Sequence, residues 1–267
     1  MFGDIKTIIF DLDGTIYHDY DFHRSYIRNL LRGTDMLNWE SSLINFADEV
    51  LGGKRLRMNS YYPKDMISRN DPESYFGALE SSLAAEMSYT DAIASCRTLY
   101  LGDAWALVTL LGETLGLLKD GRGETVFLET REDMKNNGLK GNETLRRALI
   151  HVGRQYQTVL LSNTYREIAY PLLEHLGYSG VFGCIGFSAS KPHGMLSSLE
   201  ALCPGALSRP ESILSIGDHA FNDLMPIEHL GGKTVWMSPY PNINEPAYCH
   251  KLRSIEELAE FLDGLCG

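Results

Sequence analysis

No run of apolar residues approaches the roughly 18 residues of a membrane-spanning helix, so we expect no membrane segment. Positive charge is also scarce, because 24 Lys and Arg stand against 35 Asp and Glu, a formal net charge of −11. Affinity for nucleic acid depends on clustered Lys and Arg, so this balance disfavours a nucleic-acid partner. It does not exclude a small anionic substrate, because a bound metal and a nearby lysine outweigh distant charges.

Cysteine is sparse, and its five positions never form a C-x-x-C pair, which argues against a zinc site or a thioredoxin-like motif. The number of cysteines is odd, and the polar start of the sequence is unlike a secretory leader. We therefore expect a cytoplasmic protein with reduced thiols. Nothing in the sequence predicts an oligomeric state.

The most informative segment is Ile8–Thr15, in which an apolar run ends in Asp11 and Asp13 and then in a Gly-Thr pair. The apolar part predicts a buried strand over Lys6–Phe10, and the glycine marks the turn that stops it. Carboxylates just past a buried strand are costly unless a cation or a substrate lies there. Asp and Gly are also common turn residues, so this segment alone leaves a plain turn open.

Three later segments also end an apolar run in polar groups: Thr158–Asn163, the stretch 182–187 followed by Lys191, and Ser212–Asp218 followed by Asp223. In an open parallel sheet, ligands bind outside the carboxyl ends of the strands. If the strands are parallel, the polar side chains converge on one crevice: Asp11, Asp13, Ser162, Lys191, Asp218 and Asp223. Four such coincidences are hard to explain as turns.

Together these motifs resemble the haloacid dehalogenase-like hydrolase superfamily, most of whose members are phosphatases. The residues that carry the resemblance are Asp11-Leu12-Asp13-Gly14-Thr15, Ser162-Asn163, Lys191-Pro192 and Gly217-Asp218 with Asp223. The resemblance implies an α/β fold with a Rossmann-like core, a doubly wound parallel sheet, and a mainly helical cap domain between the first two motifs. It is silent on the substrate, because the long stretch between those motifs carries no signature.

The spacing of the motifs predicts the domains. The gap after Thr15 is far longer than one crossover helix needs, so it must hold a domain. We predict a core domain of residues 1–15 and 139–267 and a cap domain of residues 16–138. Apolar spacing predicts cap helices over 22–32, 38–51, 71–87 and 91–118 and a short strand at 126–128.

Strands and helices alternate in the predicted core, which favours a doubly wound parallel sheet. A helix over 143–152 leads into the second motif. Strands near 182–187, 212–216 and 233–237 then alternate with helices near 165–176, 194–202 and 222–230. A capping box at Ser254 opens a final helix.

The residues at the strand ends suit phosphoryl transfer. Asp11, the first polar group past the strand, is the candidate nucleophile, which would form an aspartyl-phosphate. Asp13 is the candidate acid and base, which would protonate the leaving oxygen and then activate water. The resemblance implies the same roles, and it separates phosphatases from dehalogenases, which lack an aspartate at the second position.

Four carboxylates in one crevice require a cation, and oxygen ligands beside a phosphate suit Mg²⁺. Asp11 and Asp218 are the candidate side-chain ligands, to which the resemblance adds the Asp13 carbonyl and a supporting role for Asp223. Ser162, the Asn163 backbone and Lys191 would bind phosphoryl oxygens. Plainer interpretations remain open: a solvated loop lysine at Lys191, and ordinary helix starts at Ser162-Asn163 and Asp223.

Two groups of cap residues are weaker candidates for substrate contact. One is a basic stretch with two tyrosines, formed by Lys54, Arg55, Arg57, Tyr61, Tyr62, Lys64 and Arg69. Such stretches are more often solvated faces. The other group follows the first motif and consists of His18, His23 and Arg24.

These observations predict a Mg²⁺-dependent phosphatase that hydrolyses a small phosphorylated metabolite through an aspartyl-phosphate. The cap would close over the site and select the substrate. A phosphomutase of the same superfamily is the alternative within enzymes, since its intermediate passes the phosphoryl group to a sugar. A catalytically idle interaction protein on the same fold is the alternative outside them, although the intact acids and lysine argue against it.

Overall fold

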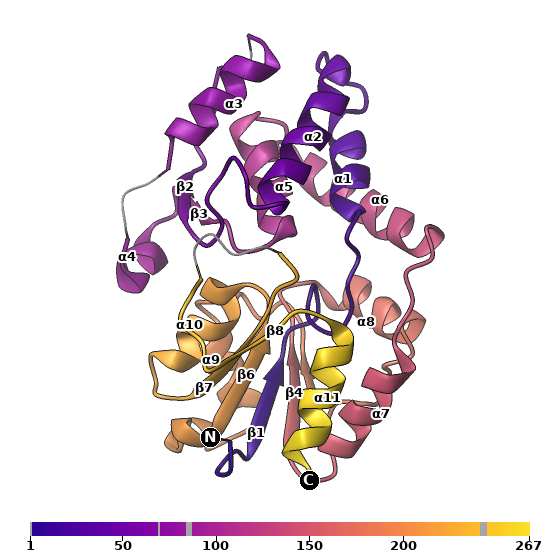
Figure 1. The fold of residues 1–267 in the computed structure, drawn as a ribbon, viewed down its shortest axis with the longest axis vertical. Coiled ribbons are helices and arrows are strands. Elements are labelled where there is room, and N and C mark those ends of the chain that lie inside the picture. Colours follow the sequence, from indigo (N-terminus) through magenta and orange to yellow (C-terminus); the bar gives the residue numbers. More distant parts are fainter. Residues whose placement is uncertain (1, 69, 84–86, 241–244) are drawn as a thin grey trace. The chain divides into compact units, whose positions relative to one another are not determined.

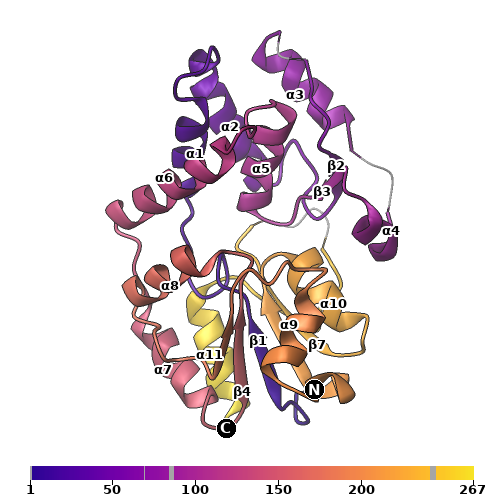
Figure 2. The same ribbon diagram turned by 180° about the vertical axis from the view of Figure 1, so that it is seen from behind.

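The computed structural model describes residues 2–68, 70–83, 87–240 and 245–267. The chain forms two compact units, each with its own internal packing. The first unit comprises Met1–His18, Leu139–Pro239 and Ala247–Gly267, and the second consists mainly of Asp19–Gly138. Figures 1 and 2 show the helices and strands of each unit from two sides.

The first unit contains a six-stranded parallel sheet in the order β5-β4-β1-β6-β7-β8. Its strands are β1 (Thr7–Phe10), β4 (Gln157–Leu161), β5 (Cys184–Gly186), β6 (Ile213–Gly217), β7 (Lys233–Met237) and β8 (His250–Leu252). The chain runs outward from β1 to one edge and then returns to build the other half. This is the predicted doubly wound sheet, with its switch point between β1 and β6.

The inner strands are buried on both faces, which explains their continuous apolar sequences. All four residues of β1 are buried. The helices of this unit are α7 (Glu143–Val152), α8 (Arg166–His175), α9 (Met195–Leu202), α10 (Met225–Glu228) and α11 (Ile255–Leu265). Helix α11 lies in front of the sheet in Figure 1 and α9 lies in front of it in Figure 2, so helices cover both faces.

Local capping fixes two helix starts where the sequence predicts them. The Asn142 side chain accepts hydrogen bonds from the backbone of Thr144 and Leu145, and α7 occupies the predicted range. Ser254 accepts from the Glu257 backbone at the start of α11, while the Glu257 carboxylate accepts from the backbone N–H of Arg253. In a standard capping box the second bond comes from the backbone N–H of the capping residue itself, so here the donor lies one residue earlier in the chain.

Other boundaries in this unit differ from the prediction. The helix expected over 222–230 is instead a π-helical turn, Ala220–Leu224, followed by the short α10 with a proline in its first turn. The strand expected over 182–187 is reduced to β5. Strand β8 was not predicted, because three residues are too short to show a pattern.

The second unit is mainly helical. Its elements are α1 (Phe22–Leu31), η1 (Leu37–Trp39), α2 (Glu40–Leu51), β2 (Tyr61–Pro63), α3 (Pro72–Ser81), α4 (Tyr89–Ala94), β3 (Thr98–Tyr100), α5 (Ala104–Thr114) and α6 (Arg122–Asn136). Helix α1 packs against α2, α5 and α6, and β2 pairs with β3 in an antiparallel ribbon. Asp71 caps α3 by accepting from the Ser74 backbone, and Pro72 takes the first helical position as the sequence predicts.

Three predictions for this unit are wrong. The helix expected over 71–87 ends at Ser81, and residues 84–86 of that range lie outside the described residues. The single helix expected over 91–118 is divided into α4, β3 and α5, because Asp103 caps a new helix by accepting from the Ala106 backbone at 2.5 Å. The strand expected at 126–128 lies inside α6, where Val126, Thr130 and Met134 are buried at four-residue spacing. A short apolar run fits either structure, and here the helical face decides.

Two further features bear on the predicted environment. Within the described part of the chain, no helix combines the length and apolar character needed to cross a bilayer. The five cysteines are free: Cys96, Cys184, Cys203, Cys249 and Cys266.

Candidate active site

The carboxyl ends of three adjacent strands place the motif residues at one edge of the sheet. Phe10, the last residue of β1, is paired with Leu160 of β4 on one side and Ile216 of β6 on the other. The Asp11 backbone N–H extends this pairing by donating to the Ile216 carbonyl at 3.0 Å. Groups that follow each strand are therefore neighbours in space.

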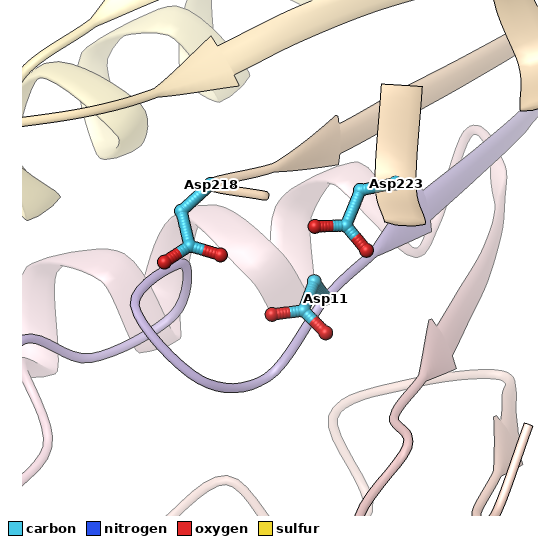
Figure 3. Close-up of side chains that lie close together, drawn as sticks. All are labelled: Asp11, Asp218 and Asp223. Atoms are coloured by element: carbon cyan, nitrogen blue, oxygen red, sulfur yellow. The ribbon is translucent and has the colours of Figure 1, made fainter. Parts of the chain in front are cut away.

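Three carboxylates gather at this edge. Oxygen atoms of Asp11, Asp218 and Asp223 all lie within 4.8 Å of one another. Figure 3 shows Asp11 after β1, Asp218 after β6 and Asp223 on the turn that follows. Gly14 makes room for them, because a Cβ atom there would lie 2.0 Å from Oδ2 of Asp218.

Lys191 lies against two of these carboxylates. Its Nζ is 2.5 Å from Oδ1 of Asp11 and 2.6 Å from Oδ1 of Asp223, and its side chain is 2 % exposed. Burial alone would lower the pKa of Lys191, but Asp11 and Asp223 outweigh burial and raise the pKa above its ordinary value. Lys191 is therefore a buried ammonium group and not a solvated loop residue.

The pKa of Asp11 is raised mainly because the carboxyl group is buried. Burial raises this pKa to about 8; Lys191 opposes the shift, and Asp223 and Asp13 add to it. The donor set is three carboxylates with oxygens close enough to share one ion. It fits a hard divalent cation such as Mg²⁺, and such a cation would relieve the repulsion.

Backbone and side-chain contacts hold two of the carboxylate residues in place. Oδ2 of Asp223 accepts from the His219 backbone N–H at 3.0 Å, and the Asp223 carbonyl accepts from the Ser215 hydroxyl at 2.7 Å. The indole N–H of Trp236 donates to the Asp218 carbonyl at 2.9 Å. These three supports were not predicted from the sequence, although a serine inside the apolar β6 run was a usable signal.

The Asp13 side chain is held apart from the three-carboxylate group by two hydroxyl donors. The Tyr17 hydroxyl donates to its Oδ1, and the Thr164 hydroxyl donates to its Oδ2 at 3.2 Å. Neither Tyr17 nor Thr164 was predicted as a site residue. The Asp13 carbonyl remains a predicted metal ligand on the strength of the resemblance.

Ser162 and Asn163 connect the end of β4 to the lysine segment. The Asn163 side chain accepts from the Lys191 backbone N–H at 2.6 Å and donates to the Lys191 carbonyl at 3.1 Å. The Ser162 hydroxyl accepts from the Thr164 backbone N–H at 3.0 Å. Asn163 therefore uses its side chain to hold Lys191, a role that the sequence analysis did not foresee.

Arg55, from the basic stretch, is engaged within the second unit. The Arg55 guanidinium pairs with Glu80 and with Glu49 and lies over the rings of Phe46 and Phe76 at 5.1 and 5.8 Å. Its charge is therefore compensated by its own neighbours. Arg69, from the same basic stretch, lies outside the described residues.

The residues after the first motif are also partnered. His23 and Arg24 both contact the Asp48 carboxylate, at 2.8 and 2.7 Å. In the first unit, Nε2 of His18 lies 2.8 Å from the Gly14 carbonyl, and burial lowers the pKa of this histidine. These contacts give the three residues structural roles.

Comparison with known proteins gives one family and several related folds. A family model described as haloacid dehalogenase-like hydrolase matches residues 5–231. A comparison with curated proteins found no match. Among solved structures, a HAD-hydrolase from Bacillus subtilis bound to magnesium shares 18% identity at a TM-score of 0.53, over 97% of this chain and 99% of that chain.

Two further solved structures are similar at the same coverage, 97% of this chain and 99% of each of theirs. One, from Thermotoga maritima, is described as a β-phosphoglucomutase, with 15% identity and a TM-score of 0.52. The other is an L-2-haloacid dehalogenase, with 16% identity and a TM-score of 0.50. At these identities the likeness shows a shared fold.

Proposed function

The chain belongs to the haloacid dehalogenase-like hydrolases, and from this premise we propose that it is a Mg²⁺-dependent phosphatase acting on a small phosphorylated metabolite. The observation that carries the proposal is the pairing of Asp11 with the buried Lys191, with Asp13 held separately two residues on. This arrangement supports a role in attack for one carboxylate and a role in proton transfer for the second, differently supported carboxylate.

In the first half of the reaction, a carboxylate oxygen of Asp11 attacks phosphorus. The bond from phosphorus to the substrate oxygen breaks, and an aspartyl-phosphate forms. Asp13 gives its proton to the departing oxygen, so that an alcohol leaves. Lys191 orients Asp11 and supplies positive charge beside the transferring group.

In the second half, Asp13 takes a proton from water, and the resulting oxygen attacks the phosphorus of the aspartyl-phosphate. Inorganic phosphate leaves, and Asp11 and Asp13 return to their starting states. Ser162 and the Asn163 backbone are proposed to bind phosphoryl oxygens. A Mg²⁺ ion held by Asp11, Asp218 and Asp223, with the Asp13 carbonyl, would neutralise charge on those oxygens when bound.

Asp13 also favours the phosphatase over a dehalogenase. Attack on carbon expels a halide, which leaves without a proton, so a proton donor beside the nucleophile has no purpose there. The phosphomutase stays as the second candidate, because both reactions share the first half and the acid. The two differ in the acceptor, which is water for the phosphatase and a sugar hydroxyl for the mutase.

A phosphate-release screen over phosphorylated metabolites with Mg²⁺ tests the proposal. We expect release from at least one small metabolite, inhibition by EDTA, and no turnover by folded Asp11→Asn. Interconversion of sugar phosphates without net phosphate release would favour the mutase. Release of halide from 2-haloacids without phosphatase activity would contradict the proposal.

Residues 16–138 are proposed to select the substrate, because the core groups contact features common to all phosphate esters.

A further inference from the structure

The Asp13 carboxylate lies between two hydroxyl groups that come from distant parts of the chain. Tyr17 donates to one of its oxygens and Thr164 donates to the other at 3.2 Å. Both contacts lie within the first unit. The carboxylate is thus held through both of its oxygens.

The Tyr17 hydroxyl is built into the turn that follows β1. Tyr17 is 3 % exposed, and its backbone forms an isolated bridge with that of Asp13. The next residue, His18, contacts the carbonyl of Gly14 at 2.8 Å. The turn therefore holds the tyrosine ring and the carboxylate in one local structure.

The Thr164 hydroxyl comes from the segment after β4. The Thr164 backbone N–H donates to the Ser162 hydroxyl at 3.0 Å, and its carbonyl accepts from the Ser188 backbone N–H at 3.1 Å. The second support of Asp13 is thus carried by the same segment as Ser162 and Asn163. It fixes the carboxylate relative to the residues proposed to bind the phosphoryl group.

The kind of support differs between the two catalytic carboxylates. Lys191 can only donate, so its contact with Asp11 favours the ionised form that attack requires. A hydroxyl can donate to a carboxylate and can also accept from a carboxylic acid. Two hydroxyls therefore suit a group that must carry a proton in one half of the reaction and lack it in the other.

We propose that Tyr17 and Thr164 are positioning residues that hold Asp13 in place for both proton transfers, a role that rests on the proposed function. Proton transfer requires the carboxylate within hydrogen-bond reach of the leaving oxygen and later of the water. Loss of either hydroxyl bond lets the Asp13 carboxylate take up positions that meet this requirement less often. The loss falls on proton transfer and leaves substrate and metal binding intact.

The test uses Tyr17→Phe and Thr164→Val, which remove one hydroxyl each and keep the shape of the side chain. Matched controls are Tyr156→Phe and Thr158→Val, which remove hydroxyls that bond Leu265 and Gly183 near the opposite end of β4. Thr164→Ser restores the hydroxyl. Rapid-quench and steady-state kinetics with an alkyl phosphate and with p-nitrophenyl phosphate separate the two halves of the reaction.

We expect kcat on the alkyl phosphate to fall roughly tenfold in each site variant, less than the ~100-fold that a misplaced reacting group can cost. With p-nitrophenyl phosphate, whose leaving group needs little protonation, phosphoenzyme should form at the wild-type rate and break down more slowly. KM and the Mg²⁺ concentration for half activity should stay within about twofold of wild type, because uniform binding is unchanged. The controls and Thr164→Ser should behave as wild type.

Wild-type rates of both steps in Tyr17→Phe and Thr164→Val, alongside a large loss in Asp13→Asn, would overturn the positioning role and leave the proposed function standing. Equal losses in the site variants and the controls would also overturn it, because a general loss of stability would then explain the result. A wild-type protein that releases no phosphate from any monoester would overturn the proposed function and this inference with it.

Discussion

Nζ of Lys191 lies 2.5 Å from Oδ1 of Asp11, a contact that joins residues 180 positions apart in the sequence. The lysine reaches Asp223 as well, so one buried cation serves two buried carboxylates. The contact links the carboxyl end of β1 to the segment after β5. It is at once a structural tie and the feature that orients the proposed nucleophile.

Lys191→Met tests the structural part of this relationship. The substitution keeps the length of the side chain but leaves two buried carboxylates without their cation. We expect the free energy of unfolding in EDTA to fall by roughly 3–5 kcal/mol, the usual loss when one partner of a buried pair is removed. Urea unfolding measures this, and Lys191→Met combined with Asp11→Asn should recover part of it. An unchanged midpoint in the single variant would show that the pair does not form in solution.

The glycine at the end of the first motif gives a prediction with a close control. Gly14 and Gly177 both have φ near +74° in the first unit, but only a Cβ at Gly14 would meet Asp218. Both Gly→Ala variants should therefore lose about 1–2 kcal/mol of stability from backbone strain. Only Gly14→Ala should also weaken Mg²⁺ activation, roughly tenfold or more, because Asp218 must move. Equal Mg²⁺ dependence in both variants would show that Asp218 does not take part in Mg²⁺ binding.

The raised pKa of Asp11 predicts how stability changes with pH when metal is removed. The folded protein keeps the Asp11 proton up to about pH 8, whereas the unfolded chain loses it near 3.8. Folding therefore takes up this proton between those values, and the contribution of Asp11 to the free energy of unfolding declines as pH rises from about 4 to 8. Thermal unfolding in EDTA should show a decline that is smaller in Asp11→Asn. Parallel curves for the two proteins would contradict the shift.

Arg55 is predicted to act on stability and not on selectivity. Its guanidinium lies over two rings and pairs with acids of the same unit, but it is partly exposed to solvent. We expect Arg55→Met to lower the free energy of unfolding by about 0.5–1 kcal/mol. The ratio of kcat/KM for the best metabolite to that for p-nitrophenyl phosphate should not change. A selective loss on the metabolite would return Arg55 to the substrate-binding candidates.

The sequence predicts the core unit well because its signals are local. Each inner strand is an apolar run buried on both faces, and Asp11, Ser162 and Asp218 stand directly after such runs. The polarity change at Asp11 and at Asp218 therefore marks both the end of a strand and the edge where ligands bind. Helix α7, with its Asn142 cap, follows from equally local rules.

The remaining features depend on contacts that no local pattern encodes. Tyr17 and Thr164 meet at Asp13 although they are 147 positions apart in the sequence, and neither has a distinctive setting. In the second unit, apolar spacing continues through Thr98–Tyr100 as if one helix persisted, yet pairing with β2 makes a strand there. Tertiary pairing overrides local preference in such short segments.

The most direct test of the account is the identity of the phosphorylated residue. Wild-type protein would be mixed with Mg²⁺ and labelled p-nitrophenyl phosphate, quenched in acid within milliseconds, and digested for peptide mapping. The account predicts label on Asp11, with none retained by Asp11→Asn and more retained by Asp13→Asn than by wild type. Label on another residue, or rapid phosphate release by folded Asp11→Asn, would contradict it.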